Sequence, residues 1–183
     1  MKIAVPKESA PGEHRVALTP PSVAKLIEAG HEVRIEAGAG VAAGYGDPEY
    51  EATGASISAD RSQLLAEAEL VVQVRGLGAN EAEGRADLEH LHAGQALLGL
   101  QEPLWAPELT QELAASGLTV MALETIPRIS RAQSMDVLSS MATLAGYKAV
   151  LIAATRLPQM FPMMMTAAGT VRPARVFVLG AGV

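Results

Sequence analysis

The sequence predicts an α/β fold in which a mostly parallel sheet is covered by helices on both faces. Short, continuous apolar runs alternate with capped helical segments along the first 136 residues. Continuous apolar strands separated by helices are typical of parallel sheets that are buried on both faces. Hydrophobic residues make up 49% of the chain but aromatic residues only 3%, so small aliphatic side chains must fill the core and let the helices pack closely on the sheet.

The expected elements follow one another in order from the N-terminus. We expect sheet strands near residues 2–5, 32–36, 69–74, 96–100 and 118–123. We expect helices near 19–30, 47–54, 80–92 and 106–117, and a short helix that begins at about residue 61. The first helix has Thr19 or Ser22 near its N-cap and ends at Gly30. The second has Asp47 as its expected N-cap and Pro48 at its first position.

Residues 137–183 begin with a long helix near 137–154 and continue through a segment rich in proline and methionine. The last residues, "RVFVLGAGV", predict a strand that enters a glycine turn, the first half of a G-x-G-x-x-G dinucleotide-binding fingerprint. An ordinary tight turn would look the same. We therefore expect three segments (1–136, 137–173 and 174–183), the last being the start of a truncated domain.

Composition excludes several classes of protein. The net charge of −6, the pI near 5.2 and the few aromatic residues argue against nucleic-acid binding. Without cysteine the chain has no disulfide or thiol chemistry, and its histidines lack metal-ligand spacing.

No signal peptide is predicted, because Pro6, Lys7 and Glu8 interrupt the N-terminal apolar run. Polar residues such as Lys148 make residues 137–154 a poor transmembrane span, and we expect a soluble chain.

The decapeptide "PRISRAQSMD" (127–136) connects the last strand to the long helix. It carries two arginines, a glutamine, an aspartate and two serines where a turn would suffice. One interpretation is a solvated loop with Asp136 or Ser134 as the helix N-cap. The other is a binding site whose polar side chains hold a ligand.

Several motifs resemble the alanine dehydrogenase and nicotinamide nucleotide transhydrogenase family along essentially the whole chain. They are "AVPKE", "HRVALTPPSVAKLIEAGHEVRIEAGAG", "YGDPEYEATGA" and "FVLGAGV". Alanine dehydrogenases typically carry a lysine where this chain has Arg75, and a histidine in the stretch that reads "LLGLQEPLW" here. The stretch "PRISRAQSMDVLSS" is instead similar to the loop of the NAD(H)-binding component of proton-translocating transhydrogenases.

The resemblance implies a Rossmann-like or flavodoxin-like N-terminal domain followed by the start of a Rossmann NAD-binding domain. It implies that Arg128, Asp136 and Ser139 contact the nicotinamide and its ribose, and that Gln133 points to a second nucleotide. Arg128, Gln133 and Asp136 are thus the catalytic candidates. The remaining NAD(H)-binding candidates are Ile129, Ser130, Arg131, Ser134, Met135, Gly180, Gly182 and Val183. Arg131 could instead only neutralise neighbouring charge, and no metal is implied.

The function implied by the resemblance is direct hydride transfer from NADH to NADP+ on a partner domain or beta subunit, coupled to proton translocation by membrane subunits. It further implies a homodimer held at the cytoplasmic side of the inner membrane, with the truncated chain inactive alone. One alternative is an alanine-dehydrogenase-like enzyme, and another is a non-catalytic docking or dimerisation fragment. Because the lysine and histidine are missing, we expect Arg15 to be structural and paired with a carboxylate.

Overall fold

The computed structural model describes residues 1–180, with Glu81 described by its backbone only. The chain divides into two compact units, Met1–Pro127 and Arg128–Val183, and each is described by itself. The boundaries expected at residues 136 and 173 remain predictions.

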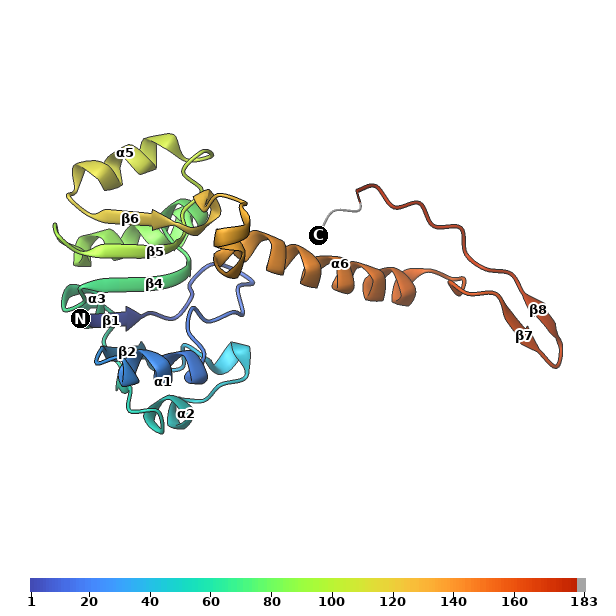
Figure 1. Ribbon diagram of the computed structural model, residues 1–183, viewed down its shortest axis with the longest axis horizontal. Helices are drawn as coiled ribbons and strands as arrows, with labels where there is room; N and C mark the ends of the chain where they lie inside the picture. The colour runs from blue at the N-terminus through green and yellow to red at the C-terminus, as the bar shows by residue number, and fades with distance from the viewer. Residues whose placement is uncertain (181–183) are drawn as a thin grey trace. The chain divides into compact units, whose positions relative to one another are not determined.

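The first unit is built on a six-stranded sheet of order β3-β2-β1-β4-β5-β6 (Figure 1). Every neighbouring pair in it is parallel, which confirms the predicted sheet. The strands are β1 (Lys2–Val5), β2 (Glu32–Glu36), β3 (Ser56–Ser58), β4 (Leu70–Arg75), β5 (Ala96–Leu100) and β6 (Thr119–Ala122). The sequence does not predict β3, because three residues are too few to show a strand pattern. This order is that of a Rossmann-type sheet, whose direction of winding reverses between β1 and β4.

Helices cover both faces of this sheet and create two separate cores. The α-helices of the unit are α1 (Pro20–Glu28), α2 (Asp47–Glu51), α3 (Arg61–Ala66), α4 (Glu81–Gly84) and α5 (Pro107–Ala115), and the 3-10 turns are η1 (Val41–Ala43), η2 (Leu77–Ala79), η3 (Arg85–His90) and η4 (Leu123–Thr125). Along β1, Ile3 and Val5 belong to the core that includes Val23 of α1. Ala4 points to the opposite core, formed with α3 and α5. Alternate side chains of a strand face opposite sides, so both faces are buried as the apolar runs require.

Asp47 differs from its predicted role. It is the first residue of α2, and the N-cap position belongs to Gly46. The Asp47 carboxylate instead accepts a hydrogen bond from the backbone N–H of Gly38, at 2.8 Å. The side chain thus ties α2 to the glycine loop that follows β2, nine residues earlier.

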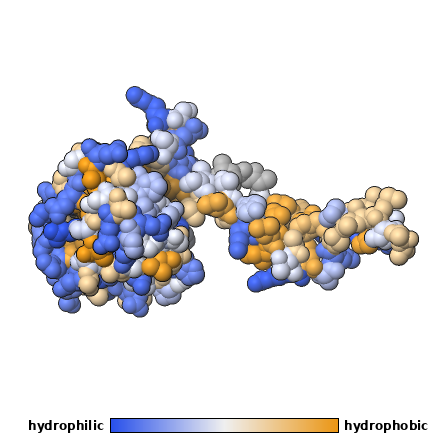
Figure 2. Space-filling model, turned by 90° about the horizontal axis from the view of Figure 1, so that it is seen from below, coloured by the Kyte–Doolittle hydropathy of each residue, from blue (hydrophilic) through white to orange (hydrophobic). Residues whose placement is uncertain are grey.

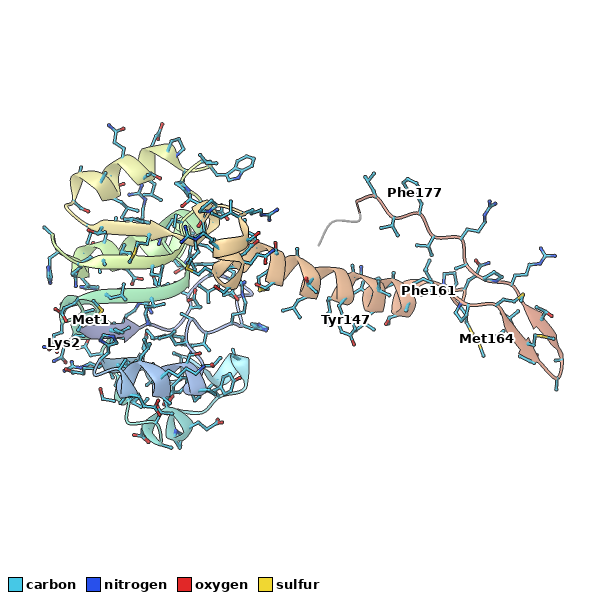
Figure 3. All side chains as sticks on the ribbon, in the orientation of Figure 1. Met1, Lys2, Tyr147, Phe161, Met164 and Phe177 are labelled. Carbon is cyan, nitrogen blue, oxygen red and sulfur yellow. The ribbon has the colours of Figure 1, made fainter. Side chains whose placement is uncertain are left out.

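The second unit consists of η5 (Ser130–Met135), the long helix α6 (Val137–Arg156) and an antiparallel hairpin of β7 (Met164–Thr166) and β8 (Gly169–Val171). Hydrophobic side chains gather on α6 (Figure 2), and no residue of the helix is buried. Tyr147, Met164 and Phe177 project from the backbone of this unit (Figure 3). Despite its polar residues, α6 is long and apolar enough to cross a membrane by length and composition, with a mean hydropathy of 1.5. No other helix within residues 1–180 meets that description.

Residues 172–179 form no strand, although the sequence predicts one from 174. A β-strand needs a hydrogen-bonding neighbour, and no other strand pairs with this segment among the residues described. Gly180 has a φ of 87°, the left-handed conformation expected of a glycine turn. The predicted site residues Gly182 and Val183 lie outside the described residues.

Candidate functional site

Asp136 organises the start of α6. Its Oδ1 accepts hydrogen bonds from the backbone N–H groups of Leu138 (3.0 Å) and Ser139 (2.9 Å), so Asp136 is the N-cap that the first interpretation of the loop predicts. The Ser139 hydroxyl donates to Oδ2 at 2.6 Å. One carboxylate therefore fixes both the first turn of the helix and a neighbouring hydroxyl.

Arg128 approaches the same carboxylate, with its Nε 4.0 Å from Oδ2 of Asp136. The Asp136 side chain is only 13% exposed, whereas that of Arg128 is 59% exposed. The pKa of Asp136 is lowered, first by the Ser139 hydroxyl, then by the Ser139 N–H, with a further contribution from the charge of Arg128. At neutral pH the group is an ionised hydrogen-bond acceptor, and it is unsuited to donating a proton.

The other predicted residues of the loop lie between Arg128 and Asp136 in the chain. Ala132 is buried and anchors η5, while its neighbours are exposed, namely Ile129, Ser130, Arg131, Gln133, Ser134 and Met135. Gly180 lies elsewhere in the unit, beside an apolar cavity of about 840 Å³ that Gly146, Ala149 and Ala153 of α6 also line. The structure thus brings Arg128, Asp136 and Ser139 together, and it presents the exposed Gln133 amide close to them in the chain.

A second polar cluster, which the sequence does not predict, lies at the carboxyl ends of β1 and β4. Glu13 accepts hydrogen bonds from Arg15 Nε (2.7 Å) and Nη2 (2.6 Å) and from Arg75 Nε (3.1 Å). The prediction that Arg15 pairs with a carboxylate is confirmed. The contact of Glu13 with Arg75 has no local signal, since 62 residues separate them and only the sheet brings them together. Glu8 completes the cluster by accepting from the backbone N–H of Val74 (2.6 Å).

The fold shifts the pKa values of the two carboxyl groups of this cluster in opposite directions. Burial raises the pKa of Glu8, against the lowering by the backbone N–H groups of Val74 and Arg75. Hydrogen bonds from Arg15 lower the pKa of Glu13 to about 2. The ionised form of Glu13 is therefore favoured in the folded state, and both arginines have their charge directed at it.

Replacing Glu13 by glutamine is expected to lower the free energy of unfolding by about 2 kcal/mol at pH 7. Since its pKa is about 2 in the fold and 4.5 ordinarily, this stabilisation is complete above pH 4.5 and is lost as the pH falls toward 2. Urea unfolding between pH 7 and pH 3 should show the difference between the wild type and Glu13→Gln narrowing below pH 4.5. Glu28→Gln, at an exposed position of α1, serves as the control. A difference that stays constant over the whole range would contradict this assignment.

Comparison with known proteins shows which family shares this sequence and fold. The family model described as "Alanine dehydrogenase/PNT, N-terminal domain" matches residues 4–145, and the corresponding C-terminal domain matches residues 149–183. The chain is 46% identical over 183 residues to an NAD(P) transhydrogenase alpha subunit of Rhodospirillum rubrum, covering 100% of this chain and 47% of that protein. It is 38% identical over 186 residues to the alanine dehydrogenase of Halomonas elongata, of which it covers 48%.

Solved structures agree with these relatives. A transhydrogenase from Sinorhizobium meliloti matches with a TM-score of 0.89 and 42% identity, over 100% of this chain and 50% of that one. An L-alanine dehydrogenase matches with a TM-score of 0.78 and 32% identity, over 94% and 46%. The chain spans about half the length of the curated relatives it matches. On this evidence the chain belongs to the alanine dehydrogenase/PNT family, with transhydrogenase alpha subunits among its relatives.

Proposed function

We propose that the chain is the NAD(H)-binding part of a proton-translocating NAD(P)+ transhydrogenase, which passes a hydride from NADH to NADP+ held by a partner domain. The observation that carries the proposal is the Asp136 carboxylate, which gathers Arg128 and Ser139 at the start of α6. These are the three residues that the resemblance assigns to the nicotinamide and its ribose. A transhydrogenase alpha subunit that is 46% identical over the whole chain supports the same assignment.

The chemistry of the loop suits this reaction. NAD(H), when bound, supplies the hydride, and transfer between two nicotinamide rings needs orientation and exclusion of water but no general acid or base. Asp136 is held ionised and can accept hydrogen bonds from a carboxamide or ribose hydroxyl. The largely exposed guanidinium of Arg128 presents several N–H donors to a ligand at the same point.

In this proposal the protein works as a subunit of a complex. The NADP(H)-binding domain and the membrane subunits belong to that complex, at the cytoplasmic side of the inner membrane, and the subunit is a homodimer. The name "subunit alpha" carried by the relatives supports the place of the chain in a complex. The NADP(H)-binding partner, the membrane side and the homodimer follow from the resemblance of the sequence to the transhydrogenase family.

The second candidate is an alanine-dehydrogenase-like activity, which the 38% identity to the Halomonas enzyme favours. Oxidative deamination needs a cation for the substrate carboxylate and a general acid or base. In this structure Arg15 and Arg75 both donate hydrogen bonds to Glu13. Because Glu13 already pairs with both guanidinium groups, the cation for a substrate carboxylate would have to come from another residue.

One pair of assays separates the two candidates. The full-length protein with its partner subunits should reduce an NADP+ analogue with NADH, and it should not reduce NAD+ when L-alanine is added. Alanine-dependent reduction of NAD+ without transfer to the analogue would reverse the order of the two proposals.

Replacing Gln133 by alanine should separate NADH binding from hydride transfer. The side chain is exposed on η5, and its amide offers two donors and an acceptor that can bridge neutral ribose hydroxyls. We expect NADH affinity to stay nearly unchanged while transfer to NADP+ on the partner slows by about tenfold. NADH titration followed by a single-turnover measurement tests both halves. A large loss of NADH affinity with normal transfer would place Gln133 in the NADH pocket alone.

A further inference from the structure

The loop between β5 and α5 exposes two adjacent large hydrophobic side chains. Leu104 is 90% exposed and Trp105 is 87% exposed, and Trp105 is the only tryptophan of the 183 residues. A single exposed leucine needs no explanation, but an exposed tryptophan beside it forms an apolar projection of the kind that marks protein interfaces. We call residues 101–106 the Trp105 loop.

This loop is held by a defined set of hydrogen bonds. One carboxylate oxygen of Glu124, in η4, accepts from the backbone N–H of both Gln101 (2.7 Å) and Glu102. The backbone N–H groups of Trp105 (2.9 Å) and Ala106 (3.0 Å) donate to the carbonyl oxygen of Glu102. Because both ends of the turn are tied, Leu104 and Trp105 are presented on a preorganised backbone, which reduces the entropy lost on binding.

The loop also stores backbone strain. Glu102 has a φ of 48°, and among residues 1–180 it is the one non-glycine residue with a positive φ. Such a conformation costs on the order of 1 kcal/mol or more and persists only where the surroundings enforce it. Here the hydrogen bond from the Glu102 N–H to Glu124 holds the backbone at this residue, and the exposed Leu104 and Trp105 follow it directly. Strain of this kind concentrates at binding sites.

The charge around the loop indicates the chemistry of what it binds. No lysine or arginine occurs between Arg85 and Arg128, and the flanking Glu102 and Glu108 are exposed. An apolar projection with an acidic rim is complementary to an apolar pocket whose rim is basic.

The position of the loop selects the partner. It follows the carboxyl end of β5, which pairs with β4 up to Arg75 and Leu100, and the carboxyl edge of such a sheet is where ligands approach. Glu124, which holds the loop, precedes Arg128 by only four residues in the chain. Four residues of chain span at most about 14 Å, so a domain that receives a hydride from a nicotinamide held by Arg128 also comes near Glu124, which holds the Trp105 loop.

We propose that Leu104 and Trp105 anchor the NADP(H)-binding partner domain, by entering an apolar pocket with a basic rim on that domain. This inference rests on the proposed function and adds a docking surface to it. Few residues carry most of the binding energy at an interface, and buried tryptophans are frequent among them.

The test measures the affinity of the full-length protein for the isolated NADP(H)-binding domain by calorimetry. Trp105→Ala should weaken binding by at least tenfold and Leu104→Ala by several-fold, with NADH affinity unchanged in both. Val41→Ala is the matched control, because Val41 is 61% exposed on η1 and should not affect binding.

Binding of the partner domain should weaken as the salt concentration is raised, because the rims of the two surfaces carry opposite charge. Trp105 fluorescence, isolated by subtracting a Trp105→Phe variant, should become protected from a soluble quencher when the partner is added.

The outcomes distinguish this inference from the proposed function. If Trp105→Ala binds the partner as tightly as the wild type, the docking surface is wrong, while hydride transfer by the wild type would leave the function standing. If the partner protects Trp105 but no hydride is transferred, docking stands and the function fails. Protection that appears on concentrating the protein alone, with a dimer that Trp105→Ala abolishes, would identify a second copy as the occupant and overturn the proposal. Absence of any binding by the wild type would overturn both.

Discussion

Replacing Arg128 or Asp136 by alanine in the full-length protein is expected to slow hydride transfer by about a hundredfold. The two side chains meet at the start of α6, and with Ser139 they form the group that would orient the nicotinamide. A ring displaced by about 1 Å loses this order of rate even when it remains bound. Single-turnover transfer at saturating NADH and partner measures the effect on the chemical step.

Two further variants separate positioning from folding. Asp136→Asn keeps an acceptor for the N–H groups of Leu138 and Ser139 but removes the charge that attracts Arg128. It should transfer hydride slowly, yet retain the roughly 1 kcal/mol of stability that an N-cap supplies. Arg156→Ala, an exposed arginine at the end of α6, should transfer at the wild-type rate. If both Arg128→Ala and Asp136→Ala transferred hydride at the wild-type rate, residues 127–136 would be a solvated loop without a role in positioning the nicotinamide.

Replacing Gly78 by alanine is expected to lower the free energy of unfolding of the first unit by about 3 kcal/mol. A Cβ at this position would lie 1.6 Å from the carbonyl oxygen of Gln101 and 2.7 Å from its carbonyl carbon. Both atoms are backbone at the end of β5, so no side-chain rotation relieves the overlap. Urea unfolding followed by far-UV circular dichroism measures the loss.

Gly146→Ala is the matched control, because it makes the same chemical change in the interior of α6. A Cβ there would meet no atom within 4 Å. Since alanine is favoured over glycine in a helix by roughly 1 kcal/mol, this variant should be neutral or more stable. If Gly78→Ala were as stable as Gly146→Ala, the close approach of η2 to the end of β5 would be wrong.

The sheet can be predicted because its information is local. Strands such as β1, β4 and β5 are largely apolar runs, β2 alternates charged and apolar residues, and α1 and α2 have proline at their start and glycine after their end. Where the local signal is absent, prediction fails: β3 is three residues long, and the apolar segment before Gly180 pairs with no strand among the described residues. The expected cap at Asp47 is wrong because an aspartate before a proline is equally suited to cap a helix or to hold a neighbouring loop.

In the candidate site, too, contacts between residues close in sequence can be predicted and contacts between distant residues cannot. The Asp136 cap and its contact with Ser139 are three residues apart in sequence, so helix-capping rules reveal them. The contact of Glu13 with Arg75 depends on the sheet placing β4 beside β1. The exposure of Trp105 is equally hidden, since a tryptophan in a mostly apolar stretch predicts a buried residue. The start of this loop is held by the carboxylate of Glu124, which is more than twenty residues away along the chain.

The central claim, that this chain holds NADH for direct transfer to a second nicotinamide, is tested most directly by isotope labelling. The full-length protein and its partner subunits would be given NADH carrying deuterium on the transferred position of C4, with NADP+ in ordinary water. The proposed function predicts that the deuterium appears in the NADPH formed, that none is released to the solvent, and that Arg128→Ala slows its appearance. Recovery of the label in water, or NADPH formed without label, would contradict direct transfer and with it the role of the Arg128–Asp136–Ser139 centre.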